Sequence, residues 1–141
     1  MMKTEYDEIT KNDLLLQIDC PDLALARHMT FKNVSDEEFL VRAEKQIECL
    51  NEAIKDIDAS KLRMHICWGN YEGPHIHDIG LEKILPIALK ANIQTYLIEA
   101  SNPRHAHEWQ VFENIKLPND KVIVPGAVSY THLRAHETPE H

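Results

Sequence analysis

Hydrophobic residues follow two different patterns along this chain, and the two patterns alternate. Short, nearly continuous hydrophobic runs lie at residues 14–18, 62–67, 93–98 and 121–124. Such runs are typical of strands in a parallel sheet, and the first of them suits a strand that is buried on both faces. The segments between the runs carry hydrophobic residues spaced three and four apart, which is the pattern of amphipathic helices.

The clearest helix is predicted between the first two runs. Ser35 followed by Glu38 has the spacing of a capping box, which marks the start of a helix. Cys49 lies within this helix and is interpreted as a small apolar filler rather than a ligand. Shorter helices are predicted over about 81–90 and 107–114. The hydrophobic face of the long helix consists of Phe39, Leu40, Ala43, Ile47, Leu50, Ile54 and Ile57.

The predicted order of elements is strand, helix, strand, helix, strand, helix, strand. This alternation predicts an α/β fold in which crossover helices join parallel strands. Four polar residues, Asp19, His65, Cys67 and Glu99, are placed at the carboxyl ends of the predicted strands. In α/β barrels the functional residues gather at that rim. We therefore expect these four side chains to cluster at one end of a parallel sheet.

Three of these residues have the side chains that zinc binds. His65 and Cys67 are two apart on a strand, so they point to the same side and can reach one ion together. Glu99 ends the next predicted strand and adds a carboxylate. The alternatives are ordinary structural roles: His65 and Cys67 as buried strand residues, Glu99 as a cap for the next segment, and Asp19 as part of a turn with Pro21.

Two further pairs of histidines have ligand-like spacing, His75 with His77 and His105 with His107. Both pairs fall in predicted loops or at the start of a helix. We interpret them as solvated histidines at the rim of the sheet.

Composition narrows the class of partner. The formal net charge of −8 argues against nucleic acid or an anionic membrane surface as the main partner. No hydrophobic stretch approaches the roughly 20 residues needed to cross a bilayer, and the amino-terminal residues lack the apolar core of a signal peptide. Three cysteines, Cys20, Cys49 and Cys67, do not suggest a disulfide framework. A reducing cytoplasm is therefore the predicted location.

Three stretches of the chain together resemble a known family. They are LQIDCPDLA at 16–24, MHICWGNYEGPH at 64–75 and IEASNPRH at 98–105. These residues resemble the carboxy-terminal catalytic barrel of the cobalamin-independent methionine synthase family, and they are most similar to its stand-alone, methionine-synthase-like members. The resemblance implies a partial TIM (β/α)8 barrel with about four parallel strands. It also implies zinc-dependent transfer of a methyl group from a methylated pterin-type donor to a small-molecule thiol such as homocysteine, in methionine biosynthesis.

The resemblance assigns roles to individual residues. It implies that His65, Cys67 and Glu99 bind zinc, and that Asp19 holds the amino group of the substrate. The family's fourth zinc ligand, a cysteine near the end of the barrel, has no counterpart in this chain. Cys20 stands where the larger synthases have a glutamate, which leaves the identity of the acceptor thiol open. No catalytic residue is assigned.

The carboxy-terminal residues depart from the family. Residues 1–127 are interpreted as a fragment of a methionine-synthase-type barrel, and residues 128–141 as a non-native tail. The tail resembles a translated sequencing adapter. We expect the full-length parent to be a zinc-dependent thiol methyltransferase, and this fragment to be inactive on its own.

Two alternatives remain open at this stage. One is a different zinc-dependent thiol alkyltransferase, similar to the epoxyalkane–coenzyme M transferases. The other is an inert, truncated barrel with no activity. A further fold relative, the uroporphyrinogen decarboxylase type, needs no zinc, so the pair of His65 and Cys67 argues against it.

Overall fold

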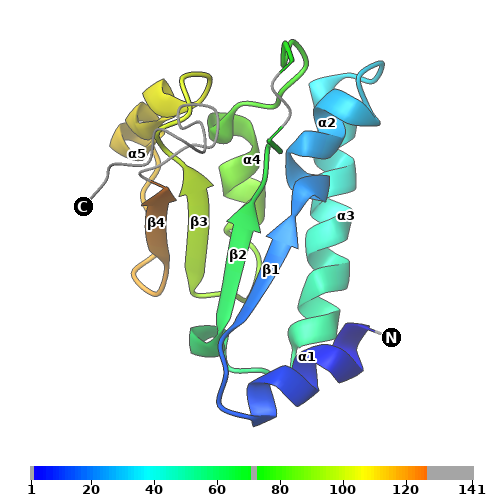
Figure 1. The fold of residues 1–141 in the computed structure, drawn as a ribbon, viewed down its shortest axis with the longest axis vertical. Helices are drawn as coiled ribbons and strands as arrows, with labels where there is room; N and C mark the ends of the chain where they lie inside the picture. The colour runs from blue at the N-terminus through cyan, green and yellow to red at the C-terminus, as the bar shows by residue number, and fades with distance from the viewer. Residues whose placement is uncertain (1, 71–72, 127–141) are drawn as a thin grey trace, which may run out of the picture.

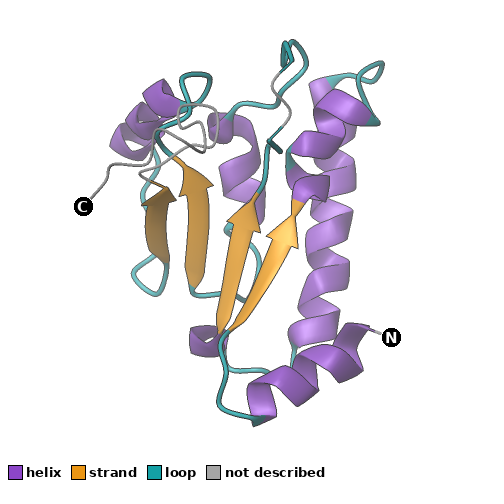
Figure 2. Ribbon diagram, viewed as in Figure 1, coloured by secondary structure: helices purple, strands orange, loops and turns teal. Residues whose placement is uncertain are grey.

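The computed structural model describes residues 2–70 and 73–126, so Tyr71 and the predicted tail at 128–141 lie outside the described residues. Four strands form one parallel sheet in the order β1-β2-β3-β4 (Figures 1 and 2). With η denoting a 3-10 helix, the elements are α1 (Met2–Lys11), β1 (Leu16–Cys20), η1 (Pro21–Leu23), α2 (Leu25–Met29), α3 (Asp36–Ile54), η2 (Ala59–Lys61), β2 (Leu62–Ile66), α4 (Leu81–Ala88), β3 (Thr95–Glu99), η3 (Ala106–Gln110), α5 (Val111–Asn114) and β4 (Val122–Gly126).

The predicted α/β class, with parallel strands joined by crossover helices, is confirmed. Two helices were not predicted. α1 has few hydrophobic residues, and only Tyr6 and Ile9 pack from it against the core, so its sequence carries little periodic signal. α2 has five residues, which is too short for a helical period to show. η1 and α2 together lead the chain from β1 to α3.

The long helix α3 forms as the sequence predicts. The Ser35 hydroxyl accepts a hydrogen bond from the backbone N–H of Glu38, so it satisfies one of the free donors of the first turn. The predicted hydrophobic face is buried or partly buried against the core. The interpretation of Cys49 as a filler is wrong, because this residue lies on the exposed side of the helix.

Among residues 2–70 and 73–126, helices cover only one face of the sheet. On β1 the buried residues are Leu16, Ile18 and Cys20, whereas Gln17 and Asp19 are exposed. The same alternation continues on β2, and the buried side chains pack with those of α3 and α4. Figure 1 views the sheet from the other, uncovered face, with α4 behind β2 and β3.

The prediction that the first strand is buried on both faces is therefore wrong. β1 also begins two residues later than predicted, and both Leu14 and Leu15 are exposed. Although the sequence run is nearly continuous in hydrophobic residues, β1 alternates between buried and exposed positions. Asp19 lies within this strand and does not follow its end. This shift matters because it fixes the face on which the Asp19 carboxylate lies.

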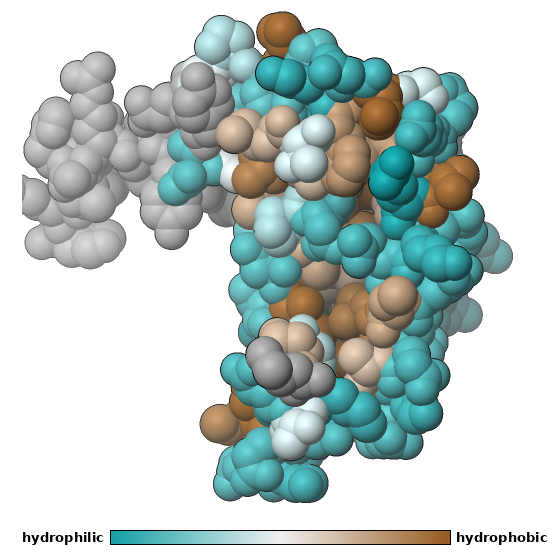
Figure 3. All heavy atoms as spheres, turned by 90° about the vertical axis from the view of Figure 1, so that its right-hand side faces the viewer, coloured by the Kyte–Doolittle hydropathy of each residue, from teal (hydrophilic) through white to brown (hydrophobic). Residues whose placement is uncertain are grey.

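The surface on the side of α2 and α3 is largely hydrophilic, with separate hydrophobic patches (Figure 3). Met29 and Val41 are examples of exposed hydrophobic residues on these two helices. Scattered exposure of this kind is normal for a protein surface. Within the described residues, no helix has both the length and the apolar character required to cross a membrane.

Candidate metal centre

The uncovered face of the sheet brings Asp19 and His65 together. The two residues are partners in the parallel register of β1 and β2, so their side chains stand next to each other. His65 Nδ1 lies 2.7 Å from Asp19 Oδ1. In the neutral tautomer that donates Nδ1–H to this carboxylate, the lone pair of Nε2 is left for a metal ion.

Cys67 follows the last residue of β2 and is held by backbone N–H groups of Leu25 and Gly69. Its carbonyl accepts a hydrogen bond from the N–H of Leu25 at the start of α2, and its Sγ accepts one from the N–H of Gly69 at 3.3 Å. Gly69 has a φ of +80°, and a Cβ there would lie 2.8 Å from a methyl carbon of Leu25. Glycine is therefore required for the turn that aims this N–H at the thiol.

The charge around Cys67 suits a cation. Burial raises the pKa of the Cys67 thiol, the hydrogen bond from Gly69 lowers it in part, and the negative charges of Asp19 and Glu99 raise it further. Deprotonating this thiol would place a third negative charge in a half-buried pocket. A divalent cation among these groups would remove that penalty.

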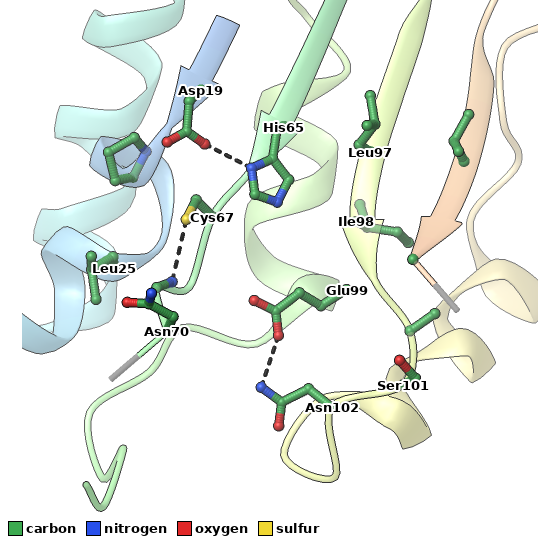
Figure 4. Close-up of a pocket in the computed structure, with 15 residues that line it drawn as sticks. Asp19, Leu25, His65, Cys67, Asn70, Leu97, Ile98, Glu99, Ser101 and Asn102 are labelled. Carbon is green, nitrogen blue, oxygen red and sulfur yellow. Dashed lines mark hydrogen bonds and ion pairs between the residues drawn. The ribbon is translucent and has the colours of Figure 1, made fainter. Parts of the chain in front are cut away.

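Glu99 is the last residue of β3 and lies on the same side of the pocket as Asn102, whose side-chain amide donates to Glu99 Oε2 at 2.8 Å (Figure 4). Asn102 is buried, so its hydrogen bond holds the carboxylate in a defined position. One Glu99 oxygen is engaged in this way, and the other points toward the side of the pocket where Cys67 lies (Figure 4).

All four residues predicted to cluster line one cavity of about 580 Å³ at the carboxyl end of the sheet. The prediction that these four side chains lie together at one end of the sheet is therefore confirmed. Asp19, His65 and Cys67 each offer a ligand atom within 4.8 Å of the other two, whereas Glu99 lies outside this group of three. Leu25, Leu97 and Val124 form hydrophobic parts of the wall.

The donor types are ones that zinc binds, and tetrahedral coordination with bonds of about 2.0–2.3 Å separates ligand atoms by roughly 3.3–3.8 Å. Donor atoms of Asp19, His65 and Cys67 lie within 4.8 Å of one another, so a small closing movement would place these three around one ion. The hydrogen bond from His65 to Asp19 reproduces the carboxylate–histidine arrangement that orients histidine ligands of metals. The geometry groups Asp19, and not Glu99, with His65 and Cys67. For His65, Cys67 and Glu99 to hold the ion with Asp19 as the orienting group, the Glu99 carboxylate would have to move toward the other two.

Sequence reasoning missed several residues that shape the site. Gly69 and Asn102 were not singled out, although a glycine two residues after a candidate ligand is a signal for a tight turn. The interpretation of His75 and His105 as solvated is wrong, because both side chains are buried against carboxylates. His107 is exposed, as predicted.

Comparisons with protein-family models, with curated proteins and with solved structures find no match for this chain. The fold and the donor set therefore define what is established: an α/β protein with a four-stranded parallel sheet and a cluster of Asp19, His65 and Cys67 at its carboxyl end.

Proposed function

We propose that this chain is part of a zinc-dependent methyltransferase that acts on a small-molecule thiol, with a methylated pterin-type donor. The observation that carries the proposal is the arrangement of His65, Cys67 and Glu99 around one cavity, with Asp19 hydrogen-bonded to His65. The resemblance to the cobalamin-independent methionine synthase family points in the same direction.

The parallel sheet supports a partial TIM barrel as the parent fold. Its uncovered face carries the candidate ligands and also leaves Val122 and Val124 of the edge strand β4 exposed. In a closed barrel these positions face an interior packed with side chains from the other strands. We propose that further β/α units cover this face in the parent protein and supply the fourth ligand.

The residues of this chain divide the chemistry as follows. His65, Cys67 and Glu99 would hold the metal, and Asp19 would fix the tautomer and orientation of His65. A metal bound there would supply Lewis acidity, which would keep a substrate thiol deprotonated at neutral pH although free thiols have a pKa near 8.5. Leu25, Leu97 and Val124 give one side of the cavity a hydrophobic wall.

The cavity wall favours an acceptor that carries a positive group beside its thiol. Two carboxylates, Asp19 and Glu99, line the cavity, and no lysine or arginine does so among residues 2–70 and 73–126. A thiol that carries an ammonium group is attracted by this wall, whereas a thiol sulfonate is repelled. The epoxyalkane–coenzyme M type of alkyltransferase is therefore the less favoured alternative.

Thiol binding can be tested without turnover. When homocysteine is titrated into the zinc-loaded chain at pH 7, we expect release of about one proton per bound thiol, since a mostly protonated thiol becomes a metal ligand. Calorimetry in two buffers with different ionisation enthalpies measures that proton. Methionine, which has no free thiol, and the metal-free chain are the controls and should release none.

The same titration is repeated with mercaptoethanesulfonate, a thiol that carries a sulfonate and no ammonium group. We expect it to bind at least tenfold more weakly than homocysteine, because its sulfonate meets the carboxylates of the cavity. Zinc-loaded protein that releases no proton with either thiol contradicts the proposed function. Tighter binding of the sulfonate would favour the coenzyme M type of chemistry instead.

A further inference from the structure

A group of histidines and carboxylates is buried next to the candidate metal centre. Asp78 Oδ2 lies 2.8 Å from His75 Nδ1 and 3.2 Å from His105 Nε2, and Asp78 Oδ1 lies 3.9 Å from His28 Nδ1. The second ring nitrogen of His105, Nδ1, lies 3.0 Å from Glu108 Oε2. The side chains of His105 and Asp78 are 5% and 10% exposed. Both nitrogens of one buried imidazole therefore face carboxylates.

The surroundings of His105 favour its charged form. Burial lowers the pKa of this imidazole, but the hydrogen bonds and negative charges of Asp78 and Glu108 outweigh burial and raise the pKa to about 9. At neutral pH the ring thus carries a proton on each nitrogen and donates to both carboxylates. Buried, charge-assisted hydrogen bonds of this kind fix orientation, because breaking one leaves a buried charge unpaired.

The network connects three segments of the carboxyl end of the sheet. Asp78 lies in the loop between β2 and α4, and His105 and Glu108 belong to the segment that follows β3. The other oxygen of Glu108, Oε1, accepts a hydrogen bond from the backbone N–H of Leu81 at the start of α4. The loop after β2 and the loop after β3 are therefore fastened to each other.

His105 contacts the residue next to Cys67. The ring of Trp68 lies 4.6 Å from that of His105, measured between centroids. Trp68 is 1% exposed, and its Nε1 donates to the carbonyl of Ile79 at 2.9 Å. The side chain that follows Cys67 is thus held between His105 and the loop, which limits the directions in which the Cys67 thiol can point.

His105 is also linked to Glu99. Its backbone N–H donates to the carbonyl of Asn102 at 2.9 Å, and the side chain of Asn102 donates to Glu99 Oε2. Asn102 is buried, and the turn that it begins leads directly to His105. Both candidate ligands, Cys67 and Glu99, are therefore one residue removed from this histidine.

We infer that His105, held by Asp78 and Glu108, is a positioning residue that fixes Cys67 through Trp68 and Glu99 through Asn102. The inference rests on the proposed metal site for its functional meaning. His105 is not among the residues that line the cavity, so it acts through its neighbours and not by touching the ion or the substrate.

The test compares His105→Gln with His107→Gln, a matched change two residues away at an exposed position. Both are made in a Cys49→Ser background, which removes the exposed thiol. Iodoacetamide labelling of the metal-free protein, followed by mass spectrometry, measures the reaction rates of Cys67 and Cys20 separately. Cys20 is buried and its pKa is raised to about 12, so its labelling reports global unfolding. Chelator competition measures zinc affinity in parallel.

We expect His105→Gln to accelerate labelling of Cys67 severalfold without accelerating Cys20, and to weaken zinc binding about tenfold, within the range that supporting residues contribute to metal sites. His107→Gln should change neither. A purely structural role would accelerate both cysteines together. If Cys20 is labelled rapidly in His105→Gln, the comparison is made with Glu108→Gln instead. This variant removes one charge and preserves side-chain volume.

The inference is overturned if His105→Gln changes neither the labelling rate of Cys67 nor the zinc affinity. It is also overturned if His105→Gln and Glu108→Gln each accelerate the labelling of Cys67 and Cys20 in parallel. The two arms separate this inference from the proposed function. If the parent chain binds no zinc, the proposed function fails, and the labelling of Cys67 still decides whether His105 positions it.

Discussion

Cys67→Ser is expected to abolish zinc binding, from about one ion per chain to none at micromolar metal. Cys67 provides the sulfur donor of the proposed site, and its Sγ already faces Asp19 and His65. A serine hydroxyl is not deprotonated at neutral pH and cannot replace a thiolate ligand. Metal analysis after dialysis against a weak chelator measures the effect.

Cys49→Ser is the matched control for this variant. It removes a thiol that is exposed on α3, away from the cavity, and should leave the zinc content unchanged. Full zinc content in Cys67→Ser would contradict the assignment. If a double change of His75 and His77 removed the metal in that case, the ion would belong to the loop between β2 and α4.

Asp19→Ala is expected to weaken zinc binding about 10–100-fold, the usual effect of removing the carboxylate that orients a histidine ligand. The change leaves His65 Nδ1 without the partner that lies 2.7 Å away, so the ring can rotate and adopt the other tautomer. The zinc affinity of Asp19→Asn should lie between those of the parent chain and Asp19→Ala, because the amide oxygen still accepts a hydrogen bond from His65 Nδ1 but carries no charge. Chelator competition measures the three affinities.

The matched control here is Gln17→Ala, two residues earlier on the same exposed face of β1 and outside the cavity. It should keep the affinity of the parent chain. The resemblance to the methionine synthase family implies a different role for Asp19, that of holding the substrate's amino group. If Asp19→Ala keeps its zinc affinity but loses binding of homocysteine, the carboxylate serves the substrate and not the histidine.

The fold was predictable where hydrophobic spacing is unambiguous. α3 combines a hydrophobic face with a cap at Ser35, and both signals are local in sequence. The run at 14–18 was misleading, since Leu14 and Leu15 continue the hydrophobic pattern although neither is buried. Which leucines enter the core depends on the register of β1 with β2, a contact between residues that are far apart in the chain.

The shared position of the candidate site residues was predictable, but their contacts were not. The ends of parallel strands meet, so the shared position of His65, Cys67 and Glu99 followed from the order of the elements. The hydrogen bond between Asp19 and His65 could not be foreseen, because it requires Asp19 to lie inside β1 and to pair with His65. His105 is likewise buried against Asp78, which lies 27 residues earlier in the chain. No local sequence pattern predicts a contact between residues so far apart.

The most direct test of the proposed zinc site is X-ray absorption spectroscopy at the zinc edge of the loaded chain. We predict one sulfur neighbour at about 2.3 Å, from Cys67, with the remaining neighbours nitrogen or oxygen at about 2.0–2.2 Å, from His65, Glu99 and solvent. A spectrum with nitrogen and oxygen neighbours only, and no sulfur, would contradict the account.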